Sequence, residues 1–77
     1  MEFEKIRDIV SAQMGIAKDK ITEDTRFSED LGMDSLDILQ VIMELEEIFQ
    51  MQFSNEDADQ VRTVGDAAAY VKKALEA

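Results

Sequence analysis

Hydrophobic side chains recur at helical spacing in four stretches of the chain, which predicts four helices. Their expected ranges are residues 3–14, 35–50, 55–60 and 64–75, so that three helices are long and the third is short. A long loop over residues 16–33 joins the first two helices, and its scattered hydrophobic side chains are expected to pin it to the core. Strand patterns are essentially missing. The pattern therefore predicts one all-α domain over residues 1–77, a small four-helix bundle with a long first loop.

The residue types at the expected helix ends agree with these ranges. Gly15 directly follows the first helix and suits a helix end. Ser54 or Asn55 can cap the third helix, and Thr63 can cap the last one. The face of the last helix that is expected to be buried consists of Val64, Ala67, Ala68, Val71 and Leu75.

The second helix carries two separate hydrophobic faces, because successive residues of a helix turn by about 100°. The side chains expected to enter the core are Ile38, Val41, Ile42, Leu45 and Phe49. A different face carries Leu36, Leu39 and Met43, flanked by Gln40, Glu46 and Glu47. Exposed hydrophobic side chains are common on soluble proteins, but three of them in one patch beside acidic side chains favour a partner surface.

The net charge of −10 is concentrated in the middle of the chain. Residues 24–60 hold eleven acids against Arg26, whereas the remaining residues hold seven acids and seven bases. Binding to nucleic acid requires many Lys and Arg side chains, so nucleic acid is not expected as a partner. A concentrated negative field attracts basic protein surfaces. The alternative, an acidic surface that only keeps the protein soluble, stays open on charge alone.

The chain contains no histidine and no cysteine. It therefore lacks a disulfide, the ligands of a structural zinc site and the usual base of a hydrolytic triad, and we expect neither a metal site nor an enzyme. No hydrophobic run approaches the length of a membrane span or of a signal peptide. The sequence thus predicts a cytoplasmic protein, most simply a monomer.

Ser35 is the best candidate for a modified residue. It lies in the tetrapeptide Asp34-Ser35-Leu36-Asp37 at the start of the second helix. A helix start offers free N–H groups and a partial positive charge, which favour an attached phosphate. A simpler interpretation is that Asp34 or Ser35 only caps the helix, with Asp37 at the third helical position. Without a histidine to activate it, the hydroxyl suits attachment of a group better than turnover.

A family resemblance supports attachment, and it rests on residues 31–37 (LGMDSLD) and 43–49 (MELEEIF). These segments resemble the acyl carrier proteins, above all the free-standing bacterial carriers of fatty acid synthesis. The resemblance implies that a phosphopantetheinyl transferase moves 4′-phosphopantetheine from coenzyme A to Ser35, between Asp34 and Leu36. The thiol of this arm would hold acyl chains as thioesters. The carrier itself would catalyse nothing.

The resemblance also implies two binding regions on the second helix. Basic docking patches of fatty acid synthesis enzymes would meet the partner face, for which we predict Asp37, Leu39, Gln40, Met43, Glu46 and Glu47. The acyl chain would slip between the second helix and the short third helix, in a pocket that we predict from Ile38, Ile42, Leu45, Ala58, Val61 and Ala67. Gln40 and Ile48 depart from the commonest bacterial carriers, which are acidic at these positions, so the native partner enzymes stay open.

Two alternatives to a fatty acid carrier remain at this point. A specialised carrier for a polyketide or another secondary pathway would use the same chemistry at Ser35 and differ only in its cargo. An acidic helical adaptor or calcium-binding protein would carry no prosthetic group. The oxygen spacing of an EF-hand loop is absent around residues 30–37, which disfavours the calcium-binding alternative.

Overall fold

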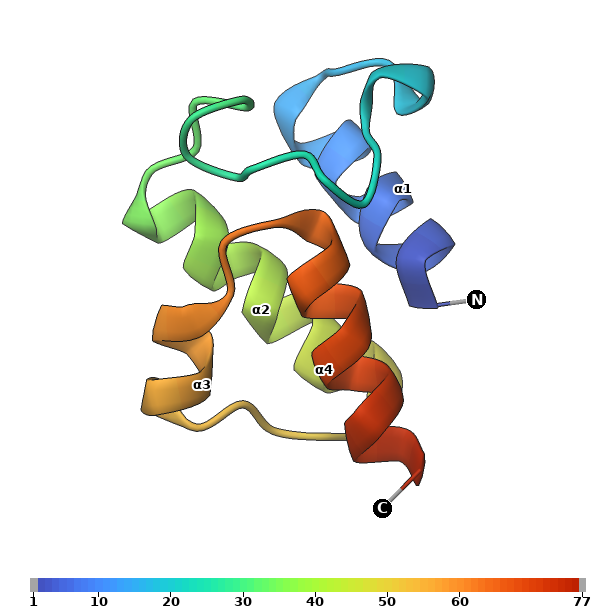
Figure 1. Cartoon of the computed structure of the whole chain (residues 1–77), viewed down its shortest axis with the longest axis vertical. Coiled ribbons are helices and arrows are strands. Elements are labelled where there is room, and N and C mark those ends of the chain that lie inside the picture. The colour runs from blue at the N-terminus through green and yellow to red at the C-terminus, as the bar shows by residue number, and fades with distance from the viewer. Residues whose placement is uncertain (1, 77) are drawn as a thin grey trace.

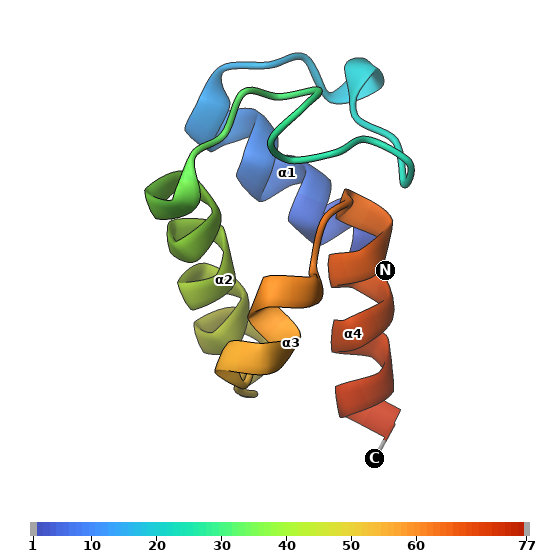
Figure 2. The same cartoon turned by 60° about the vertical axis from the view of Figure 1, so that its left-hand side comes forward.

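The computed structural model describes residues 2–76, which form a bundle of four α-helices. The elements are α1 (Glu2–Met14), the short 3-10 turn η1 (Lys18–Lys20), α2 (Ser35–Phe49), α3 (Asn55–Gln60) and α4 (Val64–Glu76). The short α3 lies on one side of the bundle (Figure 1), and the turned view shows it between α2 and α4 (Figure 2). The predicted all-α fold is confirmed, whereas η1 was not predicted. Met1 and Ala77, at the ends of the expected domain, lie outside the described residues.

The start of α2 is fixed by a reciprocal pair of side-chain bonds. The Asp37 N–H donates to Asp34 Oδ1 at 2.9 Å, and the Asp34 N–H donates to Asp37 Oδ2 at 3.1 Å. This capping box satisfies one of the free N–H groups of the first turn. The helix ends one residue earlier than expected, because Gln50 adopts a left-handed conformation with φ of 54°.

The later helix starts are capped in a similar way. The Asp57 N–H donates to Ser54 Oγ at 3.0 Å, so Ser54 rather than Asn55 caps α3. At the start of α4, the Asp66 N–H donates to Thr63 Oγ1 at 2.9 Å, and the Thr63 N–H donates back to Asp66 Oδ2 at 3.1 Å. The predicted role of Thr63 is confirmed.

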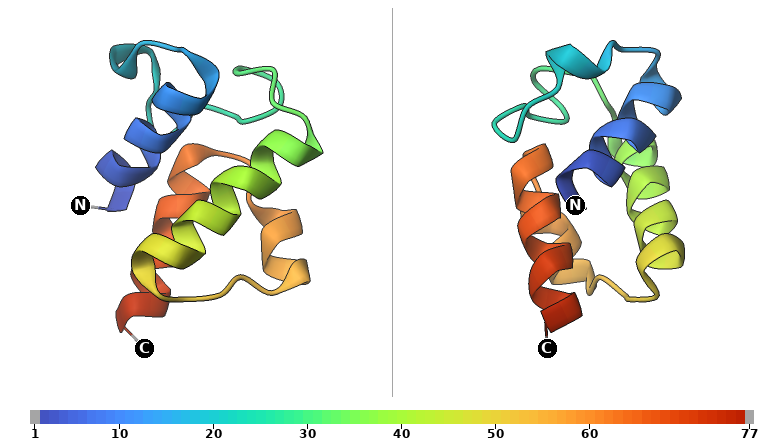
Figure 3. Two further views of the ribbon diagram at one scale, coloured as in Figure 1. Left: turned by 180° about the vertical axis from the view of Figure 1, so that it is seen from behind. Right: turned by 90° about the vertical axis from the view of Figure 1, so that its right-hand side faces the viewer.

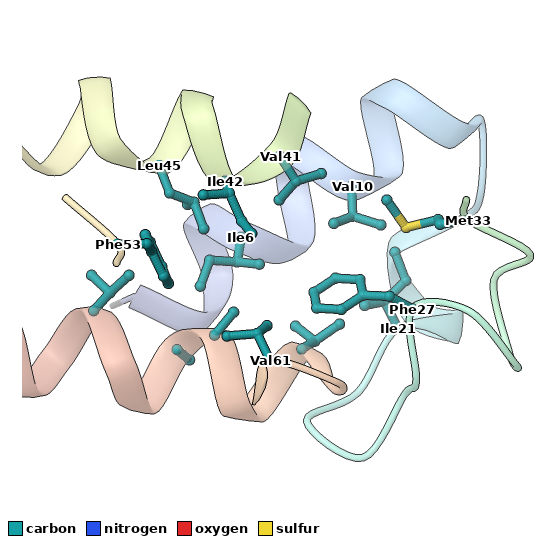
Figure 4. Close-up of a cluster of buried hydrophobic side chains, with 14 residues drawn as sticks. Ile6, Val10, Ile21, Phe27, Met33, Val41, Ile42, Leu45, Phe53 and Val61 are labelled. Carbon is teal, nitrogen blue, oxygen red and sulfur yellow. The ribbon is translucent and has the colours of Figure 1, made fainter. Parts of the chain in front are cut away.

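The core lies where the buried faces of the three long helices meet (Figure 4). The side chains that are least accessible to solvent are Ile6 and Val10 of α1, Leu45 of α2, and Val64 and Val71 of α4. The prediction for Leu75 is wrong, because this side chain is 48% exposed. The last turn of α4 projects past the neighbouring helices (Figure 3), so its hydrophobic face is only partly covered there.

The long first loop crosses one end of the bundle and buries Ile21, Phe27 and Met33 in the core (Figure 4). Its backbone is tied to the start of α4 through hydrogen bonds from Val64 N–H to Thr25 O at 2.9 Å and from Phe27 N–H to Arg62 O at 2.9 Å. The expected anchoring of this loop is therefore confirmed, and the anchoring positions the segment that leads into α2. Among the described residues, no helix has the length and hydrophobicity to cross a membrane.

Candidate functional site

Ser35 is the first residue of α2, and its side chain is exposed to solvent. The cap of the helix is Asp34, so the simpler interpretation of Ser35 as a cap is excluded. Within residues 2–76, no hydrogen bond engages the Ser35 hydroxyl. The N–H groups of Ser35 and Leu36 lie in the first turn, where a helix offers no internal acceptor. The hydroxyl is therefore free to react, at a position that favours a nearby anion.

The loop just before Ser35 is braced by an ion pair. The Arg26 guanidinium donates to Asp30 Oδ1 at 3.1 Å, and it also lies 3.9 Å from Glu29 Oε2. The Arg26 backbone N–H donates to Asp30 Oδ2 at 2.8 Å. These hydrogen bonds hold the pKa of Asp30 below its usual value and raise the pKa of Arg26. The brace links the two ends of this turn, whereas the capping box of Asp34 and Asp37 defines the start of α2.

A cavity of about 420 Å³ opens between α2 and α3, next to Ser35. Its lining includes Ser35 and two groups of other side chains. Four of these side chains are polar and exposed, namely Ser28, Glu29, Asp59 and Arg62. The hydrophobic side chains of the lining are Phe27, Ile38, Ile42, Ala58, Val61 and the partly exposed Leu39, which also belongs to the patch on α2. The arrangement joins a free hydroxyl at the rim to an apolar space behind it.

The structure brings together four of the six side chains that were predicted for an acyl pocket, namely Ile38, Ile42, Ala58 and Val61. Leu45 and Ala67 do not line the cavity. Leu45 lies about one turn beyond Ile42 on α2 and is fully buried in the main core. Ala67 also lies in the main core and is 2% exposed. Helical periodicity predicted that both would be buried, but it could not separate the core from the cavity.

Phe27 and Arg62 line the cavity, and sequence reasoning did not assign either of them to it. Phe27 is a single aromatic residue in a polar loop, and Arg62 is the only base between Arg26 and Lys72. Both features are visible in the sequence. Their position depends on the pairing of the loop with the segment before α4, which local patterns do not reveal.

The hydrophobic patch on α2 is exposed, as its spacing predicted. Leu36 is 74% exposed, Leu39 49% and Met43 58%. Glu47 is exposed beside them. These four side chains are free to meet a partner protein.

Three other residues of the predicted partner face have additional contacts. The Glu46 side chain is half-buried, and its Oε2 accepts a hydrogen bond from the Phe53 N–H at 2.9 Å. Asp37 belongs to the capping box of α2. Gln40 lies at the border of the patch and lines a groove between α1 and α2. The predicted face is therefore less uniform than the sequence suggested.

Comparison with known proteins gives consistent findings. The model of the family described as "Phosphopantetheine attachment site" matches residues 4–71. The fold is similar to that of a Mycobacterium tuberculosis protein described as an acyl carrier protein, with 33% identity over 95% of this chain and 97% of that chain and a TM-score of 0.86. It is also similar to the acyl carrier protein from Enterococcus faecalis, with 32% identity over 95% of this chain and 92% of that chain and a TM-score of 0.83.

Proposed function

Because this chain belongs to the phosphopantetheine attachment family of acyl carrier proteins, we propose that it carries the acyl chains of fatty acid synthesis on an arm attached to Ser35. The prosthetic group of the family is 4′-phosphopantetheine, whose terminal thiol holds an acyl group as a thioester. A phosphopantetheinyl transferase is an implied partner. The carrier domain itself catalyses no step of the synthesis.

The observation that carries this proposal is the free Ser35 hydroxyl at the rim of a hydrophobic cavity. Asp34 caps the helix and leaves the serine side chain without a structural task. The N–H groups of Ser35 and Leu36 lie in the first turn of α2, where a helix offers no internal acceptor, and they would favour an attached phosphate. The residues present therefore fit the prosthetic group.

The interior of the cavity supports an aliphatic cargo over a polar one. Phe27, Ile42 and Val61 are buried hydrophobic side chains, and within the cavity they offer no polar side-chain atom to a cargo. Burial of a methylene group is worth about 0.8 kcal/mol, whereas burial of an unpaired carbonyl or hydroxyl is unfavourable. A fatty acyl chain gains from this space, and an oxygen-rich polyketide chain gains much less.

We also propose that partner enzymes dock on the exposed face of α2. Leu36, Leu39 and Met43 would contact them, while acidic side chains such as Glu47 would meet their Lys and Arg. A flexible methionine suits a surface that must accept several partners. In this proposal the protein is a cytoplasmic monomer, in agreement with its cysteine-free sequence.

Attachment is tested by incubating the apo protein with coenzyme A and a phosphopantetheinyl transferase, followed by intact-mass analysis and peptide mapping. We expect one added phosphopantetheine mass, located on Ser35. Ser35→Ala should keep the helical circular dichroism spectrum and lose the modification. Ser28→Ala and Ser54→Ala are matched controls that should still be modified. Modification of the Ser35→Ala protein would contradict the assignment.

The cavity is tested by comparing the melting temperatures of the holo form and of forms loaded with saturated acyl chains. The acylated forms should melt higher, because the chain is sheltered only in the folded state. Ala58→Leu fills the cavity and should reduce this gain. Ala67→Leu instead crowds the main core and should lower the stability of both forms equally. Equal melting temperatures of the wild-type holo and acylated forms would show that the chain stays outside.

A further inference from the structure

The short helix α3 is bordered on each side by a depression that is open to solvent. The cavity of about 420 Å³ lies toward α2 and is lined by Ala58, Asp59 and Val61 of this region. A second groove of about 250 Å³ lies toward α4 and is lined by Asp57 and Gln60 of α3 and by residues of α4. Figure 2 shows α3 between these two long helices. No residue of α3 is buried, so close packing does not by itself fix the position of this helix.

A side-chain network spans the second groove instead. Tyr70 of α4 donates its hydroxyl to Asp57 Oδ2 at 2.7 Å. The same oxygen accepts the Ser54 hydroxyl at 2.8 Å, and Ser54 in turn caps α3. The Tyr70 ring stacks on buried Phe53, with 4.4 Å between ring centroids and 22° between ring planes. Tyr70 is thereby held at its ring and at its hydroxyl, and it connects α4 to the first turn of α3.

The bond between Tyr70 and Asp57 is of the stronger kind, because its acceptor is a carboxylate. The hydrogen bonds from Tyr70 and Ser54 hold the pKa of Asp57 below its usual value. The same bond to Asp57, together with partial burial, raises the pKa of Tyr70. Both shifts favour the charged acceptor and the neutral donor near neutral pH.

We propose that Tyr70 and Asp57 form a latch that fixes α3 and thereby sets the length of acyl chain that the carrier shelters best. This inference rests on the proposed function of the cavity next to Ser35. With the latch closed, α3 keeps its distance from α4, and the cavity cannot widen when a longer chain enters. Carbon atoms beyond the end of the cavity then remain in water and add no stability. Without the latch, α3 yields and longer chains are accommodated.

The first test measures hydrogen exchange in the unloaded protein, so it does not depend on any cargo. In Tyr70→Phe, the amide protons of Ala58 and Val61 should exchange about tenfold faster, because the loss of a hydrogen bond to a charged group frees α3. Asp57→Ala should have the same effect, whereas Asp57→Asn keeps an acceptor oxygen and should restore most of the protection. Exchange in α1 should stay unchanged. Unchanged exchange in α3, or an equal increase in all helices, would overturn the latch.

The second test measures the gain in melting temperature against the length of a saturated acyl chain. In the wild type, the gain should rise with chain length and then level off. In Tyr70→Phe, the gain in melting temperature should level off only at longer acyl chains. Ser11→Ala is the matched control, because it removes a hydroxyl that bonds to Ile16 O, in the connection that follows α1, and should keep the wild-type plateau.

The outcomes separate the latch from the function on which it rests. A clear gain in the wild type with the same plateau in Tyr70→Phe overturns the latch alone. A wild type that gains nothing at any chain length overturns both the proposed shelter for the acyl chain and the effect of the latch on chain length. If Tyr70 only stabilised the fold, Tyr70→Phe would lower the melting temperatures of the holo and acylated forms by the same amount. The chain length at which the gain levels off would then equal that of the wild type.

Discussion

At the scale of single residues, Gly65 is the one of the three glycines that has no room for a side chain. Its N–H donates to Glu23 O at 2.8 Å, where the first loop meets the first turn of α4. A Cβ atom at this position would lie 2.7 Å from the same backbone oxygen. Such a contact is too short for carbon and oxygen, so any other residue would push the loop away from α4.

We therefore expect Gly65→Ala to destabilise the fold by about 1–3 kcal/mol, the usual cost of overpacking. The free energy of unfolding in urea gives the measurement. Gly32→Ala is a useful control, because that position has φ of +66° but no atom within 4 Å of an added Cβ. It should lose only about 1–2 kcal/mol for the left-handed backbone. Equal stability of Gly65→Ala and wild type would mean that the loop adjusts without cost.

Glu46 and Glu47 are neighbours in the sequence but have different tasks in the structure. The Glu46 carboxylate accepts the Phe53 N–H at 2.9 Å, whereas the Glu47 side chain is exposed beside the hydrophobic patch of α2. The sequence alone gave both residues the same role in partner binding.

Glu46→Ala should lower the free energy of unfolding by about 1–2 kcal/mol, because the Phe53 N–H loses a charged acceptor. Glu47→Lys should leave stability nearly unchanged and slow modification by the phosphopantetheinyl transferase, most strongly at low salt. Urea denaturation and initial rates at two salt concentrations provide the measurements. A loss of stability in Glu47→Lys, or modification rates that do not depend on salt, would contradict the assignment of Glu46 to stability and of Glu47 to partner binding.

At the scale of elements, the contact between α3 and α4 should respond to pH at both ends of the scale. Asp57 has a folded pKa below its usual 3.8, so its contribution to stability is present above that value and is lost as pH falls through the folded pKa. Tyr70 has a folded pKa above its usual 10.0, so its contribution is present below that value and is lost as pH rises through the folded pKa.

Asp57→Asn tests the acidic side of this dependence. The difference in the free energy of unfolding between wild type and variant should be constant from about pH 6 to 8 and should shrink below about pH 4, where Asp57 becomes protonated and resembles asparagine. Glu56→Gln changes an exposed carboxylate in the first turn of the same helix and serves as a comparison for the general effect of charge. A difference that does not change with pH would show that Asp57 stays charged throughout or has no favourable bond.

At the scale of the whole molecule, the net charge of −10 works against compactness. The four salt bridges of the described residues involve only α1, η1 and the first loop, through Arg7, Lys18 and Arg26. Among the described residues, the acidic side chains of α2 and α3 form no salt bridge. Their mutual repulsion is therefore reduced mainly by dissolved ions.

We expect the melting temperature to rise by roughly 5 °C between low salt and about 0.5 M NaCl, which corresponds to about 1 kcal/mol for a domain of this size. Thermal unfolding followed by circular dichroism gives the measurement. A variant with both Glu47→Gln and Asp59→Asn has less charge in this region and should show a smaller rise. A melting temperature that is unaffected by salt would mean that charge repulsion is negligible in the folded protein.

The sequence by itself determined the helices, most of their ends and the candidates for their caps, whereas the structure decided that Asp34 caps α2 and leaves Ser35 free. Asp34, Ser54 and Thr63 act as caps because they bond to backbone groups three residues away. Spacing predicted Thr63 and narrowed the other two caps to two neighbouring residues each. The exposed patch of Leu36, Leu39 and Met43 follows from helical periodicity in the same way. These features depend only on neighbours within one or two turns.

The tertiary structure alone decided which hydrophobic residues belong to the cavity and which to the core. Leu45 and Ala67 were expected in the cavity and lie in the core, while Phe27 reaches the cavity from a loop. It also decided that Tyr70 meets Asp57, thirteen residues away on another helix. Periodicity shows that a side chain is buried, but its neighbours depend on how segments far apart in the sequence pack together, and no local pattern contains that information.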